Sequence, residues 1–162
     1  MPLGYTVDKV LGLVAAKGTG PLSSEDLLQH SNELRDHPDK DSIRFELVDL
    51  RDVELDMSPS AVRRLVEFDR KILSDLPNLR RALVVSSDLQ YSLARLYVQL
   101  MAPHRNDVEA FRELDAARRW LGLPSEPVEA EKRTAGEARA AVVSAATNSA
   151  AEHARARRKK HL

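Results

Sequence analysis

The sequence of 162 residues has no cysteine, few aromatic residues and no net charge, and each absence excludes a class of function. Without cysteine there is no disulfide, no thiol nucleophile and no cysteine-based metal site. Aromatic residues make up only 4% of the chain, which argues against a platform for stacking bases or sugars. Because 25 basic residues balance 25 acidic ones, no overall attraction to nucleic acid or anionic lipid is expected.

Long hydrophobic runs are also missing. The apolar run VLGLVAA, residues 10–16, is too short to span a bilayer, and it lacks the basic start of a secretion signal. The lack of cysteine fits a reducing compartment. We therefore expect a cytoplasmic protein without membrane insertion.

Strand-like and helix-like segments alternate along most of the chain. The run ALVV at residues 82–85 is continuously apolar, which indicates a strand covered on both faces and therefore parallel pairing. The alternation predicts an α/β fold with a mostly parallel sheet of four to five strands. The predicted strands lie within residues 5–20, 43–50, 82–85 and 107–112, and the predicted helices lie within residues 23–38, 56–73, 89–101 and 113–124.

The composition changes after Leu123, and this change sets the predicted domain boundary. Residues 1–123 form the α/β domain, and residues 124–136 form a charged linker that contains proline. Residues 137–162 are rich in alanine, which favours a helix, but they lack the large apolar residues that would dock it. We expect a helical or mobile tail that ends in a basic cluster, Arg155, Arg157, Arg158, Lys159 and Lys160.

Ser86 and Ser87 precede the third long helix and allow two interpretations. Ser87 and Gln90 have the spacing of a capping box, in which each side chain bonds the backbone N–H of the other residue. Alternatively, a helix N-terminus at the carboxyl end of a parallel strand provides a binding site for a ligand or partner.

Asp49, Arg51 and Asp52 lie at and just after the end of the predicted strand at residues 43–50 and are a second candidate surface. Paired carboxylates serve in acid–base chemistry or bind Mg²⁺, whereas a solvated loop with internal ion pairs is the structural alternative. Arg95 lies opposite the apolar stripe of its helix and is a candidate contact for a partner. Because no nucleophile, base and acid can be grouped, we predict no catalytic residue, no metal site and no cofactor.

Four blocks of the sequence, in this order, resemble the SpoIIAA-like family of the STAS superfamily over residues 4–123. This resemblance implies a mixed sheet whose first strand runs against the others, with helices mainly on one face. It also implies a regulatory domain that binds a protein partner. The blocks are GPLSSEDLLQHSNELRDHP, FELVDLRDVELDMSPSAVRRL, RALVVSSDLQYSLARLYVQLM and VEAFRELDAARRWL.

Ser58 falls where anti-sigma-factor antagonists of this superfamily carry a phosphorylated serine, after a strand end that DLRDV resembles. The family's Asp-Ser-Ser-Gly pattern is absent, because Met57 replaces the aspartate and Pro59 follows directly. A serine before a proline also suits the start of a helix, so Ser58 is either a helix cap or a phosphorylation and partner site.

The sequence therefore predicts a non-catalytic regulatory module that binds a protein partner. A small apolar or lipid-like ligand, as in the related CRAL-TRIO-type domains, is the alternative. The basic tail is the only segment expected to contact nucleic acid, and self-association into a homodimer stays open.

Overall fold

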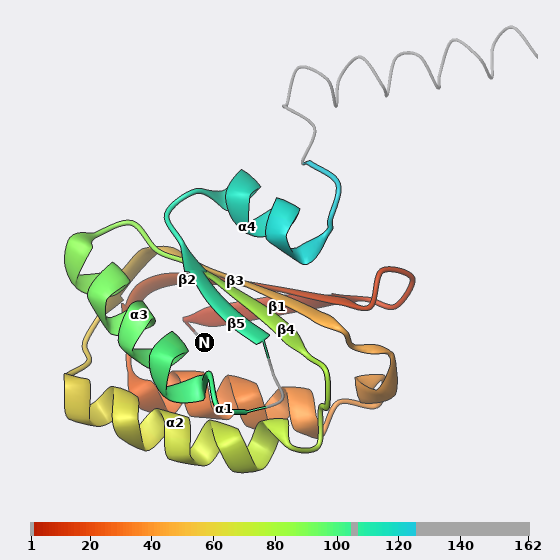
Figure 1. Cartoon of the computed structure of the whole chain (residues 1–162), viewed down its shortest axis with the longest axis horizontal. Coiled ribbons are helices and arrows are strands. Elements are labelled where there is room, and N and C mark those ends of the chain that lie inside the picture. Colours follow the sequence, from red (N-terminus) through yellow and green to blue (C-terminus); the bar gives the residue numbers. More distant parts are fainter. Residues whose placement is uncertain (1, 105–106, 126–162) are drawn as a thin grey trace, which may run out of the picture. The chain divides into compact units, whose positions relative to one another are not determined.

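The computed structural model describes residues 2–104 and 107–125, and this part of the chain forms one five-stranded sheet with four α-helices (Figure 1). The strands are β1 (Leu3–Asp8), β2 (Leu13–Leu22), β3 (Phe45–Leu55), β4 (Arg80–Val84) and β5 (Asp107–Phe111). The helices are α1 (Ser24–Arg35), α2 (Pro59–Leu73), α3 (Asp88–Met101) and α4 (Leu114–Leu121), with a 3-10 turn at Lys40–Ser42.

The sheet has the mixed, mostly parallel topology that the sequence predicts. Its strand order is β1-β2-β3-β4-β5, with β1 antiparallel to β2 and all other pairs parallel. A short turn joins β1 to β2, so these two strands must run in opposite directions. The later strands are joined through helices, which return the chain to the same end of the sheet and give parallel pairing.

Helices cover both faces of the sheet unequally. Figure 1 shows α1, α2 and α3 on one face and the short α4 on the other. On the first face Leu34, Leu73 and Met101 are each at most 1% exposed. On the second, Leu121 of α4 packs in one buried cluster with Val84 of β4. The predictions of helices mainly on one face and of a central strand covered on both sides are confirmed.

Two strands are longer than the sequence suggested. β2 continues through Gly18 and Gly20 to Leu22, although these glycines were expected to end it. Gly18 lies so close to β3 that a Cβ there would be 2.5 Å from Cγ1 of Val53, so glycine at this position lets the two strands pair. β3 continues to Leu55, so Asp49, Arg51 and Asp52 lie inside a strand and not in the loop after it.

Leu89 corrects the predicted inward stripe of α3. Its helical spacing from Leu93 and Leu96 predicts that it faces the core, but it is 66% exposed in the first turn. By contrast, Gly122 ends α4 in the left-handed conformation, with φ of 75°, as the sequence predicts.

The predicted tail, residues 137–162, lies outside the described residues together with its basic cluster. All but the first two residues of the predicted linker, 124–136, also lie outside them. Within residues 2–104 and 107–125, no helix is long and apolar enough to cross a bilayer.

Candidate functional site

Serine side chains cap the first three helices where they leave the carboxyl edge of the sheet. Ser23 accepts a hydrogen bond from the N–H of Asp26 at the start of α1, and Ser58 accepts one from Ala61 at the start of α2. Ser87 accepts one from Gln90 at the start of α3, where both bonds of the capping box are present. The structural interpretation of Ser87 is therefore confirmed.

Ser86 has a different role, because it closes an open edge of β3. β4 pairs with β3 only as far as Asp49, which leaves later carbonyl groups of β3 without a strand partner on that side. The Ser86 hydroxyl donates to the carbonyl oxygen of Arg51 at 2.9 Å, and Nε2 of Gln90 donates to that of Val53 at 2.8 Å. The loop before α3 thus replaces the missing strand, because buried backbone carbonyls need donors.

Asp49 and Asp52, the carboxylates predicted as a pair, are each paired with a different basic residue. Both Nε and Nη2 of Arg51 donate to Asp49, at 2.9 and 2.8 Å. Burial alone would raise the pKa of Asp49, but these hydrogen bonds lower it. Asp52 instead lies 3.4 Å from Nζ of Lys17 on the neighbouring strand. The pairing with cations matches the structural alternative, although within a strand and not a loop.

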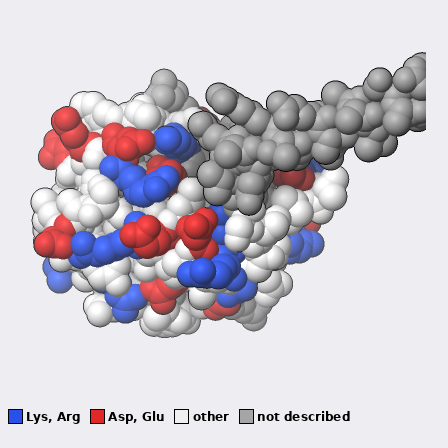
Figure 2. Space-filling model, turned by 90° about the horizontal axis from the view of Figure 1, so that it is seen from above, with Lys and Arg blue, Asp and Glu red and all other residues white. Residues whose placement is uncertain are grey.

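The other predicted contacts lie apart from this group. Nη1 of Arg95 donates to Glu109 of β5 at 2.5 Å. Around the starts of α2 and α3 and the second half of β3, seven exposed residues form what we call the carboxyl-edge surface: Asp52, Ser58, Ser60, Ser86, Ser87, Asp88 and Leu89. Acidic and basic side chains are also interspersed on the face of the molecule drawn in Figure 2, with no large region of one sign.

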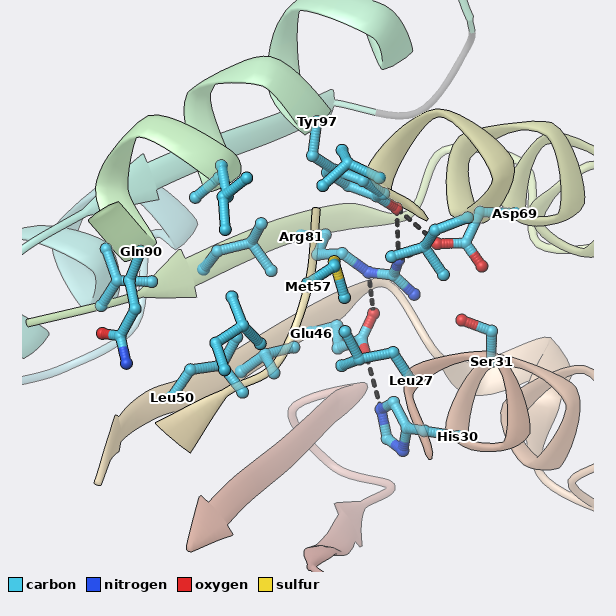
Figure 3. A pocket seen from close by; sticks show the side chains of 18 residues that line it. Leu27, His30, Ser31, Glu46, Leu50, Met57, Asp69, Arg81, Gln90 and Tyr97 are labelled. Carbon is cyan, nitrogen blue, oxygen red and sulfur yellow. Dashed lines mark hydrogen bonds and ion pairs between the residues drawn. The ribbon is translucent and has the colours of Figure 1, made fainter. Parts of the chain in front are cut away.

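A cavity lies between the sheet and helices α1, α2 and α3, as the alternative of a small bound ligand requires. The cavity measures about 60 Å³, and most of its wall is aliphatic. One end is polar, and Figure 3 shows charged and hydroxyl-bearing side chains gathered there from two strands and three helices. We call five of them the buried ionic cluster: His30, Glu46, Asp69, Arg81 and Tyr97.

Arg81 is the centre of the buried ionic cluster (Figure 3). Its Nε donates to Oε2 of Glu46 at 2.5 Å, and its Nη1 lies 2.7 Å from the Tyr97 hydroxyl and 3.2 Å from Oδ2 of Asp69. Tyr97 in turn donates to the same Oδ2 at 2.6 Å. Nε2 of His30 lies 2.7 Å from Oε1 of Glu46.

Glu46 and Arg81 of the cluster stay ionised despite burial. Burial alone would raise the pKa of Glu46, but the charge of Arg81 and the hydrogen bond to His30 lower it to about 2. Burial would lower the pKa of Arg81, but the nearby carboxylates, Glu46 first, raise it well above the usual range. Burial raises the pKa of Tyr97, so its hydroxyl stays protonated and donates a hydrogen bond.

Three polar atoms of the cluster have no hydrogen-bond partner within the described part of the chain: Nδ1 of His30, Oδ1 of Asp69 and Nη2 of Arg81. Their residues are 4%, 1% and 4% exposed, so bulk water does not solvate them. Unpaired polar atoms at such depth are rare in folded proteins, because each loses its bond to water without replacement. The polar end of the cavity therefore has unused hydrogen-bonding capacity.

The sequence contained one sign of this cluster. Asp69 interrupts the apolar stripe of its helix, which alone would favour a place at the edge of the stripe, but it is only 1% exposed and faces Arg81. Glu46 and Arg81 each lie beside strongly apolar strand residues, and alternation alone did not show that both point toward the helices. Among the described residues, no group of three or more His, Cys, Asp or Glu side chains could hold a metal ion.

No family model and no curated protein matches the sequence, but solved structures with a similar fold exist. One is an uncharacterised SpoIIAA-like protein of the DUF3478 family from Shewanella loihica PV-4, with 18% identity, a TM-score of 0.48, and coverage of 74% of this chain and 93% of that one. Another is the anti-sigma factor antagonist SpoIIAA in its unphosphorylated form, with 14% identity, a TM-score of 0.46, and coverage of 74% and 100%. These similarities concern the fold alone.

The topology of the sheet confirms the mixed, mostly parallel arrangement that was predicted from the sequence. The antiparallel first strand, the parallel strands that follow and the three helices on one face were all implied by the resemblance stated above. The described part of the chain has the mixed, mostly parallel topology that the resemblance to the SpoIIAA-like family implies.

Proposed function

We propose that the domain is a non-catalytic regulatory module that binds a protein partner in the cytoplasm through its carboxyl-edge surface. The observation that carries this proposal is Leu89, a large aliphatic side chain that is 66% exposed on this surface. An exposed leucine beside hydroxyl and carboxylate groups provides an apolar contact within a polar rim, which is the usual composition of a protein interface.

The polar residues of this surface support binding better than chemistry. The hydroxyl groups of Ser86 and Ser87 are already engaged in closing β3 and capping α3. Next to this surface, the buried Asp49 carboxylate is held by Arg51. Each group therefore fixes the surface in shape, and rigid surfaces bind with a smaller loss of conformational entropy.

Ser58 is proposed as the regulated position. Its Oγ is exposed, 3.0 Å from Oγ of Ser60, and caps α2. A phosphate there adds nearly two negative charges at a helix N-terminus, where the helix dipole favours them. Modification would change the charge of the surface while leaving the fold intact.

The apolar or lipid-like ligand, which the sequence left open, fits the cavity poorly. At about 60 Å³ the cavity is smaller than the cavity of about 150 Å³ that takes a benzene ring in a model protein. A lipid chain would require the helices to move away from the sheet, so we favour the protein partner.

The test compares two exposed aliphatic residues at opposite ends of the sheet. Val10, in the turn between β1 and β2, is 96% exposed and serves as the matched control for Leu89. The full chain is immobilised and proteins are captured from lysate of the source cells by wild type, Leu89→Arg and Val10→Arg. We expect a partner retained by wild type and Val10→Arg and reduced at least tenfold by Leu89→Arg.

Equal capture by all three proteins, or no specific partner for any, would overturn the proposal. Ser58→Asp separates regulation from binding, because it should alter capture without lowering the thermal midpoint of unfolding. Sedimentation of the purified chain shows whether the partner is a second copy, in which case Leu89→Arg shifts the dimer toward monomer.

A further inference from the structure

We propose that the cavity is a binding site for a small neutral molecule that has a hydroxyl or amide head group and a tail of a few carbon atoms. This inference does not depend on partner binding at the carboxyl-edge surface. It rests on the polar end of the cavity, where buried groups have hydrogen-bonding capacity that residues 2–104 and 107–125 do not use.

The head-group site consists of one donor and one acceptor. Nη2 of Arg81 carries N–H groups without an acceptor in the described part of the chain, and Oδ1 of Asp69 has no donor there. Figure 3 shows the side chains of Asp69 and Ser31 on either side of the outer end of the Arg81 guanidinium. A ligand atom at this place would accept from Arg81 and donate to Asp69.

The charges of the cluster favour a neutral head group. An anionic ligand would meet the carboxylate of Asp69, and a cationic ligand would meet the guanidinium of Arg81. Glu46 and His30 already occupy the other side of that guanidinium. Burying an uncompensated charge is costly, whereas a hydroxyl or primary amide satisfies donor and acceptor together.

The size and lining of the cavity define the remainder of the ligand. About 60 Å³ is several times the roughly 10–15 Å³ that one water molecule needs, so the cavity has room for a head group and a few carbons. Val62, Leu65 and Leu93 line the wall and are each at most 6% exposed. An aliphatic tail would pack against these side chains, because they offer no polar partner.

The solvent side of the cavity is at the end of β3. Leu27, Leu55 and Met57 line it and are only partly buried, whereas the residues of the buried ionic cluster are almost fully enclosed. A ligand that enters here would place its polar head inward and its tail toward the end of β3. The unbranched Met57 side chain, with its several rotamers, provides the most adaptable wall at this point.

The experiment titrates the full chain with propionamide and 1-propanol, and with propionate and propylammonium as charged controls of similar size. Methyl NMR signals of Leu65, Leu93 and Val62 report binding inside the cavity. We expect saturable shifts with the two neutral probes and at least tenfold weaker binding of both ions. Xenon tests the contribution of the apolar wall alone.

The Asp69→Asn variant tests whether Asp69 selects the ligand's head group, because a purely structural residue would not change the ratio of the probe affinities. The asparagine carbonyl would take the place of Oδ2, which accepts from Tyr97 and Arg81, and its NH₂ group would replace the free acceptor Oδ1. The site would then present donors only and one negative charge fewer. We expect the ratio of propionamide to propionate affinity to fall at least tenfold.

Ala94→Leu is the matched control, because it fills the aliphatic part of the cavity and leaves the polar end unchanged. It should weaken binding of every probe without altering their order. Failure of all probes to bind, strongest binding by an ion, or equal binding of probes regardless of head group would each overturn the proposal. The wild-type series decides the question even where a variant does not fold.

Discussion

The carboxyl-edge surface and the buried ionic cluster use polar residues in opposite ways. At the carboxyl edge, Ser86 and Ser87 satisfy nearby backbone groups while remaining exposed. In the cluster, Arg81 joins Glu46 of one strand to Asp69 of a helix, at separations of 35 and 12 residues along the chain. Exposed polar bonds to backbone groups shape a surface, whereas buried ion pairs join the layers of the fold and carry a much larger penalty when broken.

Removing the central cation tests this difference most strongly. Arg81→Met leaves the carboxylates of Glu46 and Asp69 buried without their counter-charge, so we expect a loss of about 3–5 kcal/mol in the free energy of unfolding. Urea denaturation measures it. Arg80→Met is the control, because Arg80 lies over Trp120 at 4.3 Å on the other face and should cost about 1 kcal/mol or less. Similar costs for both variants would show that the cluster is no more important than a surface contact.

At low pH the protein should lose the stability that the buried ionic cluster contributes to the folded state. The pKa of Glu46 is depressed to about 2, so its stabilising contribution is present above the ordinary glutamate value of 4.5 and is lost as pH falls toward 2. In that window wild type should lose stability more steeply than Glu46→Gln, by up to about 1.4 kcal/mol per pH unit. Denaturation at several pH values between 2 and 7 measures both slopes, and parallel slopes would contradict the assignment.

The Tyr97 hydroxyl lies between Arg81 and Asp69, and its removal has an intermediate effect. Tyr97→Phe keeps the packing but leaves Oδ2 of Asp69 with Arg81 as its remaining donor, so we expect a loss of about 1–3 kcal/mol. Tyr91→Phe, on the outer side of α3 beneath Arg112, should stay within about 0.5 kcal/mol. Thermal unfolding compares the two, and a neutral Tyr97→Phe would mean that the hydroxyl adds nothing to the pair.

The smallest effect is expected at the carboxyl-edge surface itself. Ser87→Ala removes a helix cap and should cost about 1 kcal/mol. Ser92→Ala, an exposed position in the same helix, should change stability by less than about 0.5 kcal/mol. If Ser87→Ala cost as much as Arg81→Met, the contrast between exposed and buried polar bonds would fail.

Local sequence patterns were sufficient to predict a feature of the fold wherever the residues that form it lie within a few positions of one another. Ser87 and Gln90, Ser58 with Pro59, and Gly122 were all recognised from their spacing, because helix caps depend on neighbours three or four positions away. The extent of β3 was not predicted from the sequence. Its second half is held by Gly18 on one side and by the loop before α3 on the other. Neither contact leaves a pattern within the strand itself.

The sequence by itself determined the order of strands and helices along the chain, the parallel pairing of the strands that helices connect, and the start of each capped helix. These follow from apolar periodicity, connection length and capping, which act over short stretches of chain. Only the tertiary structure decided that Glu46, Asp69, Arg81, Tyr97 and His30 share one buried site with free hydrogen-bonding atoms. Charged residues separated by dozens of positions form ion pairs only when the sheet and helices have packed. Burial then strengthens the interaction between the paired charges, because the surroundings are less polar than water.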